Sequence, residues 1–163
     1  MKWIVVAVGI AIFVFVLVRR RLSEIPLKFE TIDAKMSWLA NQAADMAGKE
    51  DVELDFSIES ISDVEELLSE LHDQYQNRSD QAGMNGLALA YGAYIGETIR
   101  RSENDAYWAE DHEVAGPESF PIHWQGGASF PVAWCYKRMS NGPEDNVWHK
   151  YQILKQQREI DSQ

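Results

Sequence analysis

The chain carries little positive charge after its first 28 residues. From residue 29 to residue 163 it has 10 Lys or Arg residues against 25 Asp or Glu residues, a balance of −15. A surface that binds nucleic acid needs basic side chains to neutralise phosphates, so this composition argues against a nucleic-acid partner. The acidic field favours instead a protein partner with a basic surface.

Cysteine and recognisable catalytic motifs are also scarce. Cys135 is the only cysteine among the 163 residues, so the chain cannot close an internal disulfide, which agrees with a reducing compartment. The sequence has no phosphate-binding loop, nucleophile elbow, dinucleotide fingerprint or paired-carboxylate motif. We therefore predict no cofactor, and an enzymatic role is the least favoured reading.

What the sequence does have is a long apolar run at its start. Residues 3–18 read WIVVAVGIAIFVFVLV, without one charged side chain. A helix of this length would span roughly 24 Å, slightly less than the hydrocarbon core of about 30 Å, and flanking basic side chains can snorkel to the interface. The residues assigned to this membrane segment and its basic stop are Trp3, Phe13, Phe15, Arg19, Arg20 and Arg21.

A cleaved signal peptide is the alternative for the same run. It would need a small-residue cleavage site, whereas here three arginines and a leucine follow. We therefore predict a single-pass transmembrane anchor over residues 1–21 and a juxtamembrane linker over 22–28. More basic residues follow the run than precede it, so the positive-inside rule places the acidic domain over 29–163 in the cytosol, with the anchor in the inner (cytoplasmic) membrane.

Three helices are predicted next. The first covers about 29–47, because apolar residues recur there at spacings of three and four and form one stripe. We expect this stripe to pack within the domain; a coiled-coil dimer is the alternative. A short strand is considered over 52–56. The second helix starts near Ser62, which has capping-box spacing to Glu65, and the third contains residues 86–101. The acidic residues assigned to the outer side of the second helix are Glu65, Glu66, Glu70 and Asp73.

The chain after residue 101 is rich in aromatic residues, glycine and proline. We predict strands at about 106–110, 118–124 and 129–138, the last two forming a hairpin because the segments SFPIHW and SFPVAW echo each other around a Gln-Gly-Gly turn. A closing helix is predicted over about 143–158, with Pro143 at its first position. The fold class is therefore α+β, with helices packed on a small antiparallel sheet.

Two segments between residues 80 and 155 resemble a known kind of domain. LAYGAYIGETIRR and FPVAWCYKRMSNGPEDNVWHKY are similar to small uncharacterised bacterial domains with a Gly-x-Tyr-hydrophobic-Gly-Glu helix, short strands and a Lys-Arg-x-x-x-Gly turn, over residues 80–155. Some such domains accompany toxin systems, so the resemblance implies an immunity or adaptor role. The matching residues are Gly92, Tyr94, Ile95, Gly96, Glu97, Lys137, Arg138 and Gly142.

Glu97 is the main candidate for a functional polar group. Arg100 and Arg101 follow it at helical spacings that stabilise ion pairs, so ordinary helix stabilisation accounts for all three residues. The alternative is a polar cluster at the helix–sheet junction, with Tyr94 and Trp108 nearby, that binds a partner. If Glu97 is buried, the expected partners of its carboxylate are Arg100, Arg138 or His123.

Other candidates are weaker. The segment Glu110-Asp111-His112-Glu113 has ligands for a hard metal, but a solvated acidic loop is the simpler interpretation, and we predict no metal. Cys135 lies in an apolar segment, where a free cysteine behaves as a small hydrophobic residue, so a catalytic thiol is disfavoured. Trp124, beside the predicted turn, is either an exposed interface anchor or part of the core.

The helix over 86–101 also contains a ridge of small residues. Ala88, Gly92 and Gly96 are four residues apart and share one face. Interior glycine costs about 1 kcal/mol relative to alanine, and close packing against another element would offset that cost. We predict that this is the central helix of the domain.

The favoured function is a membrane-anchored module that binds another protein, as an inhibitor, immunity protein or adaptor. An accessory subunit of a membrane complex is the alternative. An enzyme using Glu97, His123 or Cys135 is the third reading. The oligomeric state stays open.

Overall fold

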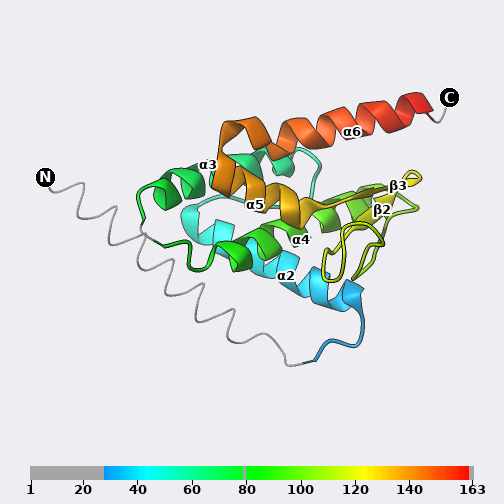
Figure 1. The fold of residues 1–163 in the computed structure, drawn as a ribbon, viewed down its shortest axis with the longest axis horizontal. Helices are drawn as coiled ribbons and strands as arrows, with labels where there is room; N and C mark the ends of the chain where they lie inside the picture. Colours follow the sequence, from blue (N-terminus) through cyan, green and yellow to red (C-terminus); the bar gives the residue numbers. More distant parts are fainter. Residues whose placement is uncertain (1–27, 79, 162–163) are drawn as a thin grey trace, which may run out of the picture.

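The computed structural model describes residues 28–78 and 80–161, and this part of the chain has five α-helices and one small sheet (Figure 1). The α+β class and the small antiparallel sheet are thereby confirmed. The helices are α2 (Ile32–Ala47), α3 (Ser60–Gln76), α4 (Met84–Ser102), α5 (Pro131–Asn141) and α6 (Val147–Asp161). The strands are β1 (Tyr107–Trp108), β2 (Ile122–Trp124) and β3 (Gly127–Ser129), and two short 3₁₀ turns are η1 (Gly48–Glu50) and η2 (Pro143–Asp145).

The predicted transmembrane anchor lies outside the described residues, as does the linker up to residue 27. Among the helices that are described, none is both long enough and apolar enough to cross a membrane. The anchor therefore stays a prediction.

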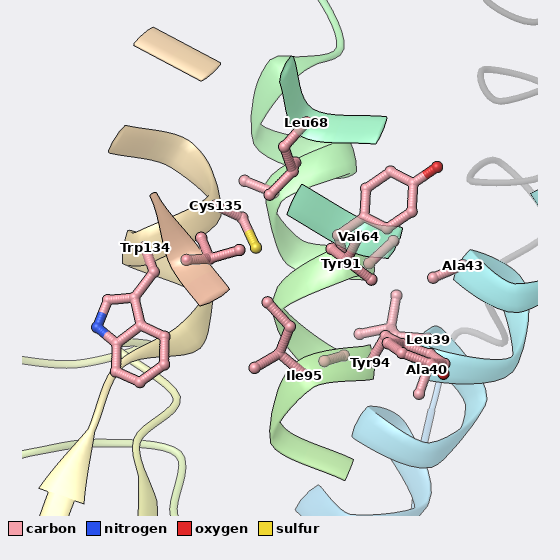
Figure 2. Packing of buried hydrophobic residues seen from close by; sticks show 14 of the residues in the cluster. Leu39, Ala40, Ala43, Val64, Leu68, Tyr91, Tyr94, Ile95, Trp134 and Cys135 are labelled. Carbon is pink, nitrogen blue, oxygen red and sulfur yellow. The ribbon is translucent and has the colours of Figure 1, made fainter. Parts of the chain in front are cut away.

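Helix α4 is the centre of the domain, with α2 and α5 packed on different sides of it (Figures 1 and 2). Every residue from Ala90 to Ile99 is buried. Tyr94 points toward Leu39 of α2, while Ile95 points toward Cys135 of α5 (Figure 2). Fully burying each large aliphatic side chain contributes about 1.5–3 kcal/mol, so this three-helix layer supplies much of the hydrophobic stabilisation.

The glycines of α4 lie where other elements approach most closely. A Cβ atom on Gly92 would be 2.6 Å from the backbone nitrogen of Val132, at the start of α5. A Cβ atom on Gly96 would overlap the six-membered ring of Trp108. The small-residue ridge therefore accepts the first turn of one helix and an indole ring, and these contacts offset the low helix propensity of glycine.

The predicted strand over 129–138 is wrong, because most of it is helix α5. Pro131 occupies the first turn of that helix, where its missing N–H is harmless and its fixed φ suits the helix. Side chains at spacings of one and three residues are buried, as expected for one helix face. These buried residues are Pro131, Trp134, Cys135, Arg138 and Met139.

Three smaller predictions are also corrected. Residues 52–56 form no strand. Helix α3 begins at Ser60 instead of Ser62, and the predicted capping box is not formed, since the Ser62 hydroxyl donates to the carbonyl of Glu59 at 2.7 Å. The closing helix begins at Val147, because residues 143–145 form the 3₁₀ turn η2.

The sheet has the order β1-β2-β3, and both strand pairs are antiparallel. The predicted hairpin exists but is shorter: Trp124 pairs with Gly127 across a turn of Gln125 and Gly126, both with positive φ, as two-residue hairpin turns of this kind require. Side chains alternate across the sheet. Trp108 and its cross-strand neighbour Ile122 are buried, whereas Tyr107 and His123 face outward.

Candidate functional site

Glu97 lies at the junction between α4, α2 and the sheet, and its carboxylate is fully buried. Oε1 accepts hydrogen bonds from Arg100 Nε at 2.7 Å and from Trp108 Nε1 at 2.9 Å. Oε2 accepts from Ser37 Oγ at 2.9 Å and from Arg100 Nη2 at 3.0 Å. Arg101 Nε lies 3.8 Å from the same oxygen. Of the three expected partners, the structure therefore brings Arg100 to Glu97, and not Arg138 or His123.

The electrostatics of this cluster favour an ionised carboxylate. Burial by itself would raise the pKa of Glu97, but the hydrogen bonds from Arg100, Trp108 and Ser37 outweigh burial and hold the pKa below its ordinary value. The same contact raises the pKa of the Arg100 guanidinium. A carboxylate whose two oxygens both accept bonds from the chain, with no exposed surface, is placed to bind elements together and not to transfer protons to a substrate.

Trp108 reaches Glu97 because of the neighbouring glycine. Its indole ring lies against Gly96, at the place a Cβ atom would occupy. That approach lets Nε1 donate to Glu97, one residue further along α4. The glycine and the glutamate therefore form one local unit that attaches β1 to α4.

Tyr94, His123 and Trp124 are separate from this cluster. The hydroxyl of Tyr94 accepts from the backbone N–H of Phe56 at 2.7 Å and pairs with Ser60 Oγ at 2.6 Å, and burial raises its pKa. His123 stacks on exposed Tyr107 on the outer face of the sheet, with ring centroids 4.9 Å apart.

Trp124 is buried, so it is part of the core and not an exposed anchor. The guanidinium carbon of Arg158, on α6, lies 4.0 Å from the centre of its ring. Arg158 also donates to the carbonyl of Trp124 at 2.9 Å and to Ser129 Oγ at 3.1 Å. Burial lowers the pKa of Arg158. This contact attaches the end of α6 to the hairpin.

Glu65 is a second buried carboxylate, so the prediction that it lies on the outer side of its helix is wrong. Arg138 Nε donates to Oε1, and the backbone N–H of Val147 donates to Oε2 at 2.8 Å. The ion pair is almost fully buried and joins α3, α5 and the start of α6. Glu65 directly follows the buried Val64 in the sequence, which was a signal that it lies near the buried face of the helix. Its charge favoured the prediction of an exposed side chain instead.

The outer side of α3 carries a feature that the sequence did not single out. With the loop after η1, it forms an open depression of about 300 Å³. Five carboxylates line it, with two apolar side chains and no basic one; within the described residues none of the five forms an ion pair or a hydrogen bond. The lining residues are Asp51, Val52, Glu53, Asp63, Glu66, Leu67 and Glu70.

The remaining chemical candidates are not assembled into a site. Cys135 is fully buried, and burial raises its pKa, which disfavours the thiolate. His112 Nδ1 accepts from the backbone N–H groups of Val114 and Ala115, both at 3.2 Å, so it is engaged in its own loop. In the described ranges, no three His, Cys, Asp or Glu side chains are placed to hold a metal ion.

Comparison with protein families, with curated proteins and with solved structures gave no match to the chain.

Proposed function

We propose that the chain is a membrane-anchored module that binds another protein, and that the acidic depression on α3 binds a basic part of that partner. The observation that carries the proposal is the group of five carboxylates without counter-charges around one depression. An inhibitor, immunity protein or adaptor would use such a surface. In this proposal the membrane anchor is the apolar run over residues 3–18.

The shape of the depression supports a projecting side chain as its occupant. Pockets for small molecules are mostly apolar and enclose their ligand, whereas this depression is open and its rim is charged. A lysine or arginine could lay its aliphatic part on Val52 and Leu67 while its charged end meets the carboxylates. Complementary charge of this kind mainly steers association and selects the partner.

The test is a charge-matched capture experiment with the full chain in detergent. Three carboxylates of the depression are changed to glutamine in one variant, and three exposed carboxylates elsewhere are changed in the control. The depression variant is Glu53→Gln, Glu66→Gln and Glu70→Gln, and the control is Glu30→Gln, Glu110→Gln and Glu113→Gln. Circular dichroism checks that both variants fold.

The proposal predicts that the wild-type chain and the control variant capture the same partner protein. The depression variant should fail to capture it. For that protein the three substitutions together should weaken binding by roughly 0.6–3 kcal/mol, since exposed ion pairs contribute about 0.2–1 kcal/mol each. Binding should also weaken as salt is raised, because exposed charges are screened. Equal capture by the depression variant and the control would contradict the proposal.

A further inference from the structure

The two walls of the acidic depression are joined by one short segment of the chain. Residues 51–53 form one wall, and α3 carries the other from Asp63 to Glu70. Residues 54–59 connect the first wall to the start of α3 at Ser60. The path of this connecting segment therefore contributes to the distance between the two walls.

Phe56, inside the connecting segment, has a backbone conformation that is costly for its side chain. Its φ is 63°, in the left-handed region, where the Cβ atom of an L-residue comes too close to the following carbonyl oxygen. A bulky residue keeps such a conformation only where its surroundings impose it. The residues that contact Phe56 therefore have to offset this cost.

Two side chains of α4 make the contacts that hold Phe56. The backbone N–H of Phe56 donates to the hydroxyl of Tyr94 at 2.7 Å, and the two rings pack together with their centroids 4.6 Å apart. The guanidinium carbon of Arg101 lies 3.5 Å from the centre of the Phe56 ring, which is a cation–π contact. Tyr94 and Arg101 are seven residues apart in the sequence, so one face of α4 makes all these contacts.

The hydroxyl of Tyr94 also contacts the start of α3. It lies 2.6 Å from Ser60 Oγ, and Ser60 Oγ donates its own hydrogen to the carbonyl of Ser57 at 2.6 Å. Tyr94 is therefore the donor to Ser60 and the acceptor from Phe56. Since Tyr94 is fully buried, water has no access to replace either bond. One hydroxyl thus fixes both the turn at Phe56 and the first residue of α3.

We infer that Tyr94 and Arg101 are positioning residues for the acidic depression, because they hold the turn at Phe56 and thereby set the spacing of its two walls. The inference rests on the proposed function of the depression. Neither residue lines the depression, so both act through Phe56 and not by touching the partner. If the turn is released in some molecules, only the remaining fraction has its walls in place, and the apparent affinity falls by that fraction.

The test compares two substitutions of Phe56 in the full chain, in nonionic detergent. Phe56→Ala and Phe56→Gly both remove the ring, and both keep the backbone N–H that donates to Tyr94. Alanine retains the cost of the left-handed conformation, whereas glycine, which has no Cβ atom, does not. If the ring contacts serve to offset that cost, the glycine variant should keep the turn and the alanine variant should lose it.

The probe is a fluorescently labelled tetra-arginine peptide at low salt, and its Kd is measured by fluorescence anisotropy. Phe56→Ala should raise the Kd by about fivefold or more, the factor that corresponds to the lower end of the cost of a left-handed residue. Phe56→Gly should leave the Kd within about twofold of wild type, since both signs of φ are open to glycine. Circular dichroism checks that both variants fold.

Substitutions of Arg101, whose side chain is 42% exposed, give a second measurement at a site that tolerates change. Arg101→Gln should raise the Kd about two- to fivefold, although the loss of a positive charge would by itself favour a basic peptide. Arg101→Lys keeps a cation over the ring and should restore binding, and the control Lys137→Gln, at an exposed position, should not weaken it. In the Phe56→Gly background Arg101→Gln should have no effect, whereas an effect that acted through Glu97 would remain.

The depression variant and its control, described under the proposed function, separate the two ways of failing. If the depression variant loses the peptide but Phe56→Ala and Phe56→Gly bind it equally, whether as wild type or more weakly, the positioning role is overturned and the depression is still the binding site. If the depression variant binds the peptide as tightly as its control does, the proposed function is overturned, and this inference with it.

Discussion

Glu97 and Glu65 are both buried carboxylates paired with arginine, yet they depend on very different parts of the chain. The ionic partners of Glu97 are three and four residues away on the same helix. The ionic partner of Glu65 is Arg138, 73 residues away, and its other hydrogen-bond donor is the backbone N–H of Val147, 82 residues away. Glu97 therefore stabilises one helix end and its junction with the sheet, whereas Glu65 joins three helices that are distant in sequence.

Their exposure to water also differs in a way that determines the cost of losing a partner. The side chain of Arg100 is 35% exposed, whereas that of Arg138 is 3% exposed. Water can partly replace Arg100 beside Glu97, but it has little access to the pair of Glu65 and Arg138. A buried charge that loses its only ionic partner is expensive, so the long-range pair should be the more sensitive of the two.

Loss of Arg138 should have the largest effect. Arg138→Ala leaves the Glu65 charge buried with one backbone donor, so we expect the free energy of unfolding to fall by about 3–5 kcal/mol. Urea unfolding of the full chain, followed by tryptophan fluorescence, measures it. The adjacent exposed residue supplies a control, Lys137→Ala, expected within about 0.5 kcal/mol of wild type. Similar values for the two variants would show that Glu65 does not depend on Arg138.

Neutralising Glu97 should cost less. Glu97→Gln keeps the shape of the side chain but removes the charge that strengthens its hydrogen bonds to Arg100. A hydrogen bond to a charged group is worth about 1.5–3 kcal/mol. We therefore expect the free energy of unfolding to fall by an amount in that range, in the same urea measurement. Glu110→Gln, at an exposed position, is the control and should change little. A loss as large as that of Arg138→Ala would contradict the view that water compensates at Glu97.

Adding one methyl group at Gly96 tests the same cluster without changing any charge. Gly96→Ala gains helix propensity but forces the Trp108 ring away from Glu97, so we expect a net loss of about 1–3 kcal/mol, as for overpacked cores. Gly48→Ala is the matched control, because a Cβ atom there meets no other atom within 4 Å, and it should be neutral or stabilising. A melting temperature for Gly96→Ala at or above that of wild type would refute the close-packing account.

The smallest effect is in the pH dependence of stability. The pKa of Glu97 is lowered from its ordinary value of 4.5 in the folded chain, so the folded state binds this proton less readily than the unfolded state does. The stabilisation is complete above pH 4.5 and is lost as pH falls through the lower folded pKa. The stability difference between wild type and Glu97→Gln should therefore shrink with acidification below pH 4.5 in urea titrations. A difference that stays constant down to pH 3 would show that ionisation of Glu97 does not contribute.

Local patterns in the sequence were enough to predict the helices α2, α3, α4 and α6. They were also enough to predict the pairing of Glu97 with Arg100. They are relations within one helix, where neighbours are set by a spacing of three or four residues. The pairing of Glu65 with Arg138 was missed because charged residues are rarely buried, and only tertiary packing brings α3 and α5 together.

The segment from residue 129 to 138 shows why a strand was predicted in place of α5. Pro131, three aromatic residues and a valine have high strand or turn preference, and the repeated motif suggested two equal arms of a hairpin. Packing of Val132 onto Gly92 requires a helix start there, and that contact lies 40 residues away. The depression was missed for a similar reason, since its two walls come from a loop and a helix that meet only in the folded chain.

The contact of Arg158 with the hairpin also has a consequence for synthesis on the ribosome. Arg158 comes 29 residues after Ser129, so at about 5–20 residues per second it is added roughly 1.5–6 s after the hairpin is complete. Until then the Trp124 ring lacks the guanidinium that covers it in the finished domain. The hairpin can therefore complete its packing only after the last helix of the domain has been made.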